Sequence, residues 1–317
     1  MTRGPDVDLT TSVGSLSFVN PVMTASGTAG HGVELAPWLD LSSLGAVVVK
    51  SLRVEPWSGN PAPRVHETPA GMLNSVGLQG PGIEAWMCDS LPALVASGAR
   101  VVVSIWGSTV DDYARAAALL AEAPPAVVAV EVNVSCPNVE DRRRMFAHSS
   151  MATEEALSAT ASCRRPRWAK LSPNVGDLVP IAEAAQRGGA EAVTLINTVM
   201  AMAIDPGTRR YRLGSAGAGG GLSGPAIRPV AVRAVHDVHA ALPGLPIIGV
   251  GGVASGDDAV ELLLAGASAI QVGTATFADP RACRRVIEGI ETWCRRHGVA
   301  GVKELIGAVH RDRGERP

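Results

Sequence analysis

The sequence predicts an α/β fold, a (β/α)8 TIM barrel with inserted loops at its C-terminal face, and three observations support this prediction. Eight short runs rich in β-branched residues recur along the 317 residues, and each run ends in a polar or glycine-containing cluster. The runs are apolar almost throughout, which is typical of parallel strands that are covered on both faces. The predicted strands are 21–27, 45–51, 99–107, 126–135, 167–172, 191–198, 245–252 and 268–274.

Helical patterns between most of these strands are the third observation. In segment 255–267, Ser255 is a suitable N-cap, and the acidic residues that follow it complement the helix dipole. Segment 176–189 ends in glycine, which commonly terminates a helix. Further amphipathic patterns cover 111–123 and 225–242. Eight strand–helix repeats in a chain of this length favour a closed barrel.

The main alternative for this alternation is an open, doubly wound sheet. That fold places a GxGxxG turn after its first strand, whereas ASGTAG at 25–30 lacks the spacing. Two long connections rich in glycine and proline, 52–81 and 199–224, interrupt the alternation, and we expect them to be lids or binding loops. No shift in composition marks a linker, so residues 1–317 are expected to form a single domain.

The composition argues against several classes of function. Acidic residues (30) slightly outnumber basic residues (28), which does not suit a nucleic-acid-binding surface, and the basic cluster 142–144 is interpreted as a solvated loop. No apolar run approaches ~18 residues, so we expect no membrane span, and the N-terminus shows no signal-peptide core. Five cysteines without a CxxC pair argue against a disulfide scaffold or an iron–sulfur ligand set, and they favour a reducing, cytoplasmic location.

The residues that close the predicted strands form the candidate site, because a barrel of this kind carries its active site at the carboxyl ends of its strands. Taken singly, each has an ordinary explanation, since a lysine reaches for water and an amide or hydroxyl caps the next helix. Together they place lysines, amides and a thiol around one opening, a set suited to a planar, polar, anionic ring. They are Ser26, Lys50, Ser51, Ser104, Asn133, Ser135, Cys136, Lys170, Asn197, Thr198, Gly251, Gly252, Gly273 and Thr274.

Carboxylates and histidines are missing from these strand ends apart from Glu131, which we expect to satisfy a structural pair. A catalytic metal is therefore not expected. The glycines after the last two strands leave backbone N–H groups open to an anion, so a phosphorylated cofactor such as FMN would fit there. The role of Cys136 stays open at this point: its rim position suits a nucleophile or a general base, whereas many cysteines are simply small buried hydrophobes.

Longer motifs spread over all eight strands carry a further signal. They are VNPVMTASG, VVVKS, GNPAPRVHETPAGMLNSVGLQGPG, EVNVSCPN, AKLSPNV, TLINT, GGGLSGPAIRPVA, PIIGVGGV and QVGTATF. Together they resemble the dihydroorotate dehydrogenase family, and in particular the catalytic subunit of its NAD-linked, heteromeric class 1 members. The resemblance implies an FMN-containing (β/α)8 barrel that oxidises dihydroorotate to orotate in pyrimidine biosynthesis.

The resemblance also implies roles for single residues. Cys136 would be the catalytic base that takes the proton from carbon 5 of the substrate, while carbon 6 gives a hydride to the flavin. The implied substrate contacts are Lys50, Asn74, Ser75, Val76, Gly77, Leu78, Asn133, Asn197 and Thr198, with Asn138 as a further substrate or lid contact. The implied contacts to one FMN per chain are Ser26, Lys50, Ser51, Ser104, Asn133, Lys170, Ile196, Gly224, Gly251, Gly252, Gly273 and Thr274.

The chain has no iron–sulfur or FAD-binding pattern of its own. The resemblance therefore implies a homodimeric core with a partner subunit that carries FAD and [2Fe-2S] and passes electrons to NAD. Alternatives are a fumarate-linked homodimer, a different dihydropyrimidine substrate, a non-catalytic flavin-binding scaffold, and a non-flavin barrel that binds a phosphorylated metabolite as an aldolase or isomerase. The stretch VEDRRRMFAHSS at 139–150 departs from the glycine-rich lid that is usual in the family.

Overall fold

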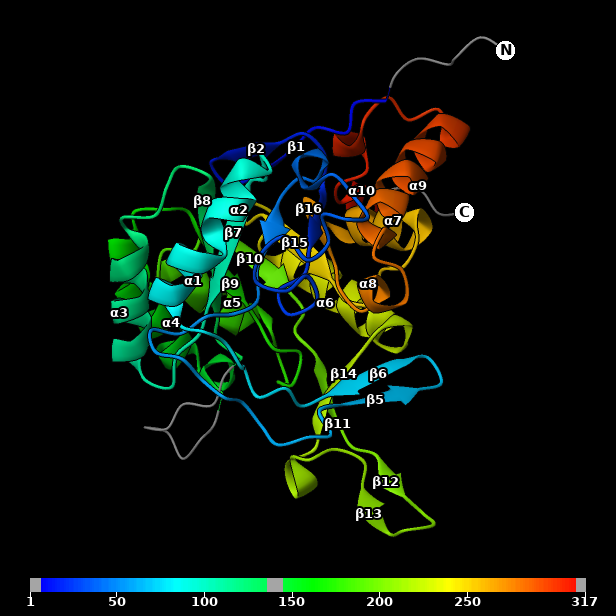
Figure 1. Ribbon diagram of the computed structural model, residues 1–317. Helices are drawn as coiled ribbons and strands as arrows, with labels where there is room; N and C mark the ends of the chain where they lie inside the picture. The colour runs from blue at the N-terminus through cyan, green and yellow to red at the C-terminus, as the bar shows by residue number, and fades with distance from the viewer. Residues whose placement is uncertain (1–6, 136–144, 312–317) are drawn as a thin grey trace.

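The computed structural model describes residues 7–135 and 145–311. Eight parallel strands form one sheet in the order β3-β16-β15-β10-β9-β8-β7-β4. A parallel bridge between Met23 and Ala46 joins the two ends of this order, so the sheet closes into a barrel. Helices surround the strands (Figure 1), and the predicted (β/α)8 architecture is confirmed.

Each barrel strand lies inside one of the eight predicted segments. The strands are β3 (Val22–Thr24), β4 (Val47–Val48), β7 (Val101–Ile105), β8 (Val127–Asn133), β9 (Arg167–Lys170), β10 (Ala192–Leu195), β15 (Ile247–Val250) and β16 (Ala269–Val272). Nearly all of their residues are buried, which explains the continuous apolar runs in the sequence. The strands are shorter than the predicted segments because the last residues of most runs belong to the loops at the barrel mouth.

The four predicted helices are present as α3 (Val110–Leu120), α5 (Val179–Arg187), α6 (Arg228–Ala241) and α7 (Gly256–Ala265). As expected, Ser255 caps α7: its hydroxyl accepts the backbone N–H of Asp258, whose carboxylate accepts the N–H of Ser255 in return. Further helices are α1 (Ile83–Asp89), α2 (Leu91–Ala96), α4 (Ser150–Ala159), α8 (Ala275–Ala278), α9 (Ala282–His297) and α10 (Ala308–Arg311). In the two described ranges, no helix combines the length and the apolar character needed to cross a membrane.

Side chains from alternate strand positions fill the barrel interior. An apolar inner layer consists of Met23, Ala46, Val48, Val102, Ala129, Trp168, Ala192, Ile248 and Ala269. The hairpin of β1 (Thr11–Val13) and β2 (Leu16–Phe18) packs Val13 and Phe18 against this layer. The N-terminal end of the barrel is therefore a packed core, and the interior becomes polar only towards the opposite end.

The two long connections form a second sheet. Segment 52–81 contains β5 (Val65–Thr68) and β6 (Gly71–Asn74), and segment 199–224 contains β11 (Val199–Ala201) and β14 (Gly220–Ser223). These strands pair antiparallel in the order β11-β14-β6-β5, and the hairpin of β12 (Ile204–Asp205) and β13 (Arg210–Tyr211) follows β11. Figure 1 shows this sheet and hairpin projecting from one end of the barrel.

The sequence predicted these connections as loops and missed their strands. Glycine is depleted in strands, so Gly220 and Gly221 give the β14 segment a low strand propensity. The local sequence therefore does not predict a strand there. The partner of Gly221 is Asn74, which lies 147 positions earlier in the chain. Long-range pairing therefore creates strands that the local sequence does not specify.

Candidate active site

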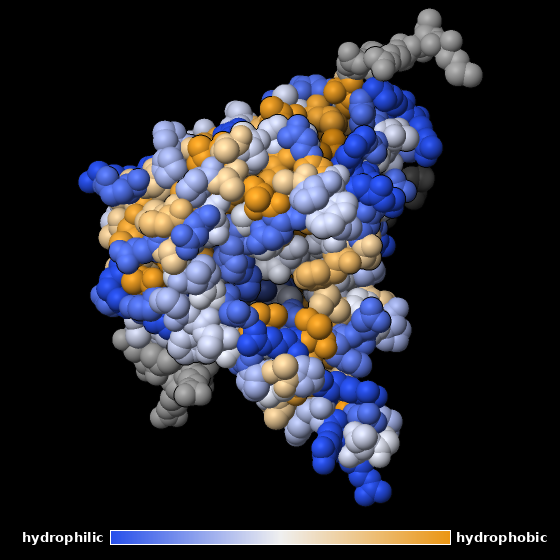
Figure 2. All heavy atoms as spheres, in the orientation of Figure 1, coloured by the Kyte–Doolittle hydropathy of each residue, from blue (hydrophilic) through white to orange (hydrophobic). Residues whose placement is uncertain are grey.

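A cavity of about 1180 Å³ lies at the C-terminal end of the barrel. That volume is somewhat above the usual range for a ligand pocket, which ends at about 1,000 Å³. Figure 2 shows the surface hollowed between the body of the barrel and the projecting strands. Both the barrel strand ends and the second sheet contribute to its wall, so the two long connections enclose the space above the strand ends.

Almost all of the residues predicted to bind a substrate or a cofactor line this single cavity. Ser104 does not, because it is fully buried behind Ser51, whose hydroxyl oxygen lies 2.9 Å from the hydroxyl oxygen of Ser104. Cys136 and Asn138 lie outside the described residues. The predicted residues in the wall are Ser26, Lys50, Ser51, Asn74, Ser75, Val76, Gly77, Leu78, Asn133, Lys170, Ile196, Asn197, Thr198, Gly224, Gly251, Gly252, Gly273 and Thr274.

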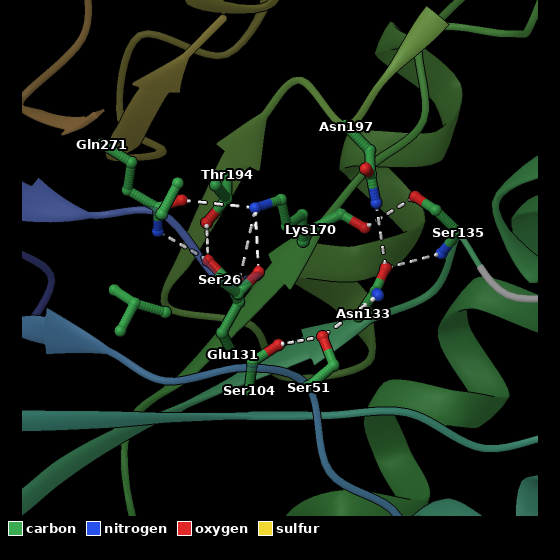
Figure 3. A network of polar contacts seen from close by, with 12 residues as sticks. Ser26, Ser51, Ser104, Glu131, Asn133, Ser135, Lys170, Thr194, Asn197 and Gln271 are labelled. Atoms are coloured by element: carbon green, nitrogen blue, oxygen red, sulfur yellow. Dashed lines mark hydrogen bonds and ion pairs between the residues drawn. The ribbon is translucent and has the colours of Figure 1, made fainter. Parts of the chain in front are cut away.

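Asn133 connects several strand ends at the floor of the cavity. Its side-chain oxygen accepts hydrogen bonds from Nδ2 of Asn197 and from the backbone N–H of Ser135, both at 3.2 Å. Its own Nδ2 donates to the Ser51 hydroxyl at 3.4 Å. Figure 3 shows these side chains converging from separate strand ends. The two amides are thereby held in one arrangement, from which they can pair with the N–H and C=O groups of a ring.

Lys170 and Glu131 form a buried ion pair beneath the cavity. The ammonium of Lys170 donates to Oγ of Ser26 at 3.2 Å and to Oε1 of Gln271 at 3.3 Å, and it lies 3.7 Å from Oε1 of Glu131. Oε2 of Glu131 accepts hydrogen bonds from Thr194 at 3.1 Å and from Nε2 of Gln271 at 2.7 Å. The structural pair expected for Glu131 is therefore present, and its partner is Lys170.

Four residues of this ion-pair network, one each from β8, β9, β10 and β16, belong to a polar layer directly above the apolar inner layer. Each lies two positions after a residue of the apolar layer, and the alternation of a strand points both side chains into the barrel. The pairs are Ala129 and Glu131, Trp168 and Lys170, Ala192 and Thr194, and Ala269 and Gln271. Sequence reasoning missed Thr194 and Gln271, although each is the polar residue that interrupts an apolar run at an inward-facing position.

Glycines at the ends of the last two strands form the opposite wall. Gly252 has φ +74°, and a Cβ on it would lie 2.9 Å from the backbone nitrogen of Arg228, where α6 begins. Only glycine therefore allows this strand end to approach the helix so closely. Gly273 follows β16, and the neighbouring Thr274 donates to the hydroxyl of Ser223 at 2.7 Å. A glycine-rich backbone with neighbouring hydroxyls of this kind can bind an anionic group such as a phosphate.

The wall formed by residues 74–78 is held in place from outside the cavity. The indole Nε1 of Trp57 donates to the backbone oxygen of Gly77 at 3.0 Å. Trp57 also packs edge-on against Trp106, with ring centroids 5.9 Å apart. The guanidinium of Arg53 lies over both rings, at 5.1 and 5.2 Å from their centroids. These contacts support the loop from outside the cavity, and the contacts of Trp57 with Gly77 and Trp106 join residues too far apart in the sequence to have been predicted.

Charged groups of both signs line the cavity. Several of them were missed by sequence reasoning because they lie within the long connections, just after α8 or on α9, away from any strand end. At the rim, the pKa of Asp279 is lowered, mainly because the backbone N–H of Arg281 donates to its carboxylate at 3.0 Å. Across the described ranges, no three His, Cys, Asp or Glu side chains are grouped so as to hold a metal ion. The missed wall residues include His66, Glu67, Ser223, Phe277, Asp279 and Arg285.

Comparisons with known proteins identify the family to which this chain belongs. A family model described as dihydroorotate dehydrogenase matches residues 8–293. The catalytic subunit of dihydroorotate dehydrogenase B (NAD(+)) from Desulforudis audaxviator (strain MP104C) is 49% identical over 309 residues, which cover 96% of this chain and 98% of that protein. The proteins of the same name from Pelobacter propionicus and Geotalea uraniireducens are each 47% identical, over 95% of this chain and 98% of their own lengths. The matches span the barrel and every described residue of the site, and the chain therefore belongs to the dihydroorotate dehydrogenase family.

Proposed function

We propose that this chain oxidises dihydroorotate to orotate in pyrimidine biosynthesis and passes the electrons through FMN to a partner subunit and then to NAD. One observation carries the proposal: two lysines, three asparagines and a glycine-rich wall converge on one cavity in a chain of this family. The relatives described above are named as catalytic subunits of an NAD(+)-linked enzyme, which supports the choice of acceptor.

The donor set of the cavity suits FMN. Lys50 and Lys170 supply ammonium groups for the electron-rich edge of the flavin ring, and the glycine-rich wall leaves backbone N–H groups for the phosphate. When bound, FMN supplies the hydride-accepting chemistry that amino-acid side chains lack. We assign its contacts to Ser26, Lys50, Ser51, Asn133, Lys170, Ile196, Gly224, Gly251, Gly252, Gly273 and Thr274, and we place Ser104 behind them, acting through Ser51.

The amides of the cavity suit the substrate. The ring of dihydroorotate carries alternating N–H and C=O groups, for which Asn side chains are complementary because each offers both a donor and an acceptor. We assign these contacts to Asn74, Asn133 and Asn197, with Thr198 beside them and the wall 75–78 covering the ring. Lys50 binds the substrate carboxylate through a charge-assisted hydrogen bond.

We assign the role of general base to Cys136. It follows Ser135, which lines the cavity, although Cys136 itself lies outside the described residues. Its Sγ takes the proton from carbon 5 while the hydride leaves carbon 6. A free thiol has a pKa of about 8.5, and neighbouring cations favour the thiolate, so the two lysines of the cavity that Ser135 lines suit this role.

We further propose a homodimeric core that binds an electron-transfer subunit carrying FAD and [2Fe-2S]. The word "subunit" in the relatives' names supports a heteromeric assembly. We treat residues 1–317 as a single domain built around the barrel. We also propose a cytoplasmic location, which is supported by the free thiols of Cys88, Cys163, Cys283 and Cys294.

An absorbance titration of the purified chain tests this function. We expect a yellow protein whose flavin absorbance is bleached by dihydroorotate, and which reduces NAD efficiently only after the partner subunit is added. Efficient NAD reduction by the chain alone would contradict the proposed partner, and turnover with fumarate would favour the homodimeric alternative. A folded but colourless protein would favour a barrel that acts on a phosphorylated metabolite. Flavin that dihydroorotate does not bleach would favour a non-catalytic scaffold or another dihydropyrimidine.

A further inference from the structure

Glu131 is a fully buried carboxylate to which the proposed reaction gives no role. A buried charge is tolerated only when it is paired and hydrogen-bonded. Both of its hydrogen bonds, from Thr194 and Gln271, go to Oε2. Oε1 has no hydrogen-bond donor among the described residues, and it lies 3.7 Å from the ammonium of Lys170. One oxygen is thus fixed by neutral donors, while the other faces a positive charge.

Gln271 couples the position of Lys170 to that of Glu131. Its Oε1 accepts from Lys170 at 3.3 Å while its Nε2 donates to Glu131 at 2.7 Å (Figure 3). An ammonium group has three N–H donors. Ser26 and Gln271 accept two of them, which leaves the third for the cavity that Lys170 lines. The carboxylate and the amide together aim the Lys170 ammonium at the ligand.

We propose that Glu131 is a positioning residue that holds the Lys170 ammonium at the cavity floor and offsets its charge towards bound flavin. The inference rests on the proposed binding of FMN. Reduction adds negative charge to the flavin ring, so Lys170 favours the reduced form and Glu131 opposes it. The other titratable or charged groups of the described wall are Lys50, His66, Glu67, Asp279 and Arg285. These groups stay constant across variants at positions 131 and 170, so their contribution cancels in a comparison.

The test is the equilibrium between oxidised and reduced flavin in the full-length, FMN-loaded chain, measured against a redox dye of known potential. Glu131→Gln keeps the volume of the side chain and removes its charge. We expect it to shift the equilibrium at least tenfold towards reduced flavin, which is about 30 mV for a two-electron couple. Lys170→Gln should shift the equilibrium in the opposite direction. A residue needed only for folding would change the melting temperature and leave this equilibrium unaltered.

Two further variants keep the proposal testable if Glu131→Gln does not fold. Glu131→Asp retains the charge, so its equilibrium should stay within about threefold of the wild type, which is at most about half of the expected unit-charge effect on a free-energy scale. The double variant with Glu131→Gln and Lys170→Gln removes both charges, and its flavin equilibrium should be much nearer that of the wild type than the equilibrium of Lys170→Gln alone.

Two outcomes overturn the role of Glu131 only. One is a double variant whose flavin equilibrium is shifted as far as that of Lys170→Gln, and the other is a flavin-loaded Glu131→Gln protein with an unchanged equilibrium. A wild-type chain that binds no flavin overturns the proposed function and this inference with it.

Discussion

Nδ2 of Asn197 donates a hydrogen bond of 3.2 Å to Oδ1 of Asn133, and this contact joins the ends of β10 and β8 above the intervening strand β9. Both amides have their orientation fixed by other contacts, since the Oδ1 atom of Asn197 accepts the backbone N–H of Thr198 at 2.8 Å and Nδ2 of Asn133 donates to Ser51. A ligand therefore meets a rigid pair of amides, and little side-chain freedom is lost when it binds.

Replacing Asn197 by Ala removes one amide of this pair and leaves the other less constrained. We expect the dihydroorotate concentration for half-maximal flavin reduction to rise by about 10- to 100-fold, which corresponds to the loss of one or two buried hydrogen bonds. The flavin content should stay close to one per chain, because Asn197 is assigned to the substrate alone. A rapid-mixing titration of flavin bleaching measures both quantities. Gln186→Ala, on an exposed position of α5, is the control, and an equal response of the two variants would contradict the assignment.

Replacing Cys136 by Ala should remove the proton acceptor and keep the flavin. We expect the rate of flavin reduction by dihydroorotate to fall by about 10²- to 10⁴-fold, the usual contribution of a general base. The exposed Cys88 supplies a matched control, and Cys88→Ala should leave the rate unchanged. Cys283 cannot substitute as a base, because burial raises the pKa of its thiol to about 12. An undiminished rate in Cys136→Ala would refute the base assignment.

The sequence was sufficient for the barrel and for the strand-end residues of the cavity wall, because both follow from local pattern. Each apolar run contains one strand, and closure of the sheet brings every strand end to the same opening. That is why Lys50, Asn133 and Lys170, which are far apart in the sequence, line one cavity. This reasoning does not apply to Ser104, because Ser104 lies within β7 and not at the end of that strand.

The parts that could not be predicted depend on contacts between distant segments. Strand β14 forms because Gly221, Leu222 and Ser223 pair with β6 across the mouth of the barrel. The edge-on contact of Trp57 with Trp106 also depends on distant segments, because neither residue carries a local signal for a loop anchor. Gln271 carries a partial local signal. One polar residue inside an apolar strand indicates that another polar group lies nearby in the barrel interior, but it does not say which group. The carboxylate of Glu131 and the ammonium of Lys170 reveal which partner that is.

Replacing Trp57 by Phe tests whether the outer contacts fix the wall 74–78. The variant keeps an aromatic ring beside Trp106 but loses the hydrogen bond from Nε1 to the backbone oxygen of Gly77. We expect a rise of about 3- to 10-fold in the half-saturating dihydroorotate concentration, since a single neutral hydrogen bond is involved. The flavin spectrum should not change. Trp38, which is 52% exposed, provides the control variant Trp38→Phe. An unchanged half-saturation in Trp57→Phe would show that the loop needs no such anchor.

A cluster of three histidines connects α6 to the C-terminal helix α10, away from the cavity. The ring of His310 stacks on that of His236 with centroids 4.5 Å apart, and it lies 4.8 Å from that of His239. Gly266 and Gly307 approach His239 so closely that a Cβ on either would come within 2.4 Å of its ring. The imidazole of His239 is therefore partly covered by backbone and by the ring of His310, an environment that disfavours its protonation.

The stability of the protein should consequently fall on mild acidification. Burial lowers the pKa of His239, and the neighbouring charges of His310, His236 and Arg311 add to this shift. In the unfolded chain the same group titrates near 6.5, so below that pH the unfolded state binds more protons and the free energy of unfolding decreases. The contribution is complete above about pH 6.5 and is lost progressively as the pH falls.

We expect the drop in melting temperature between pH 7.5 and pH 5 to be smaller in His239→Gln than in the wild type, by roughly 1–3 °C. The exposed His148 supplies the control: His148→Gln should reproduce the wild-type drop, and a His239→Gln drop equal to that of the wild type would exclude the cluster as its source.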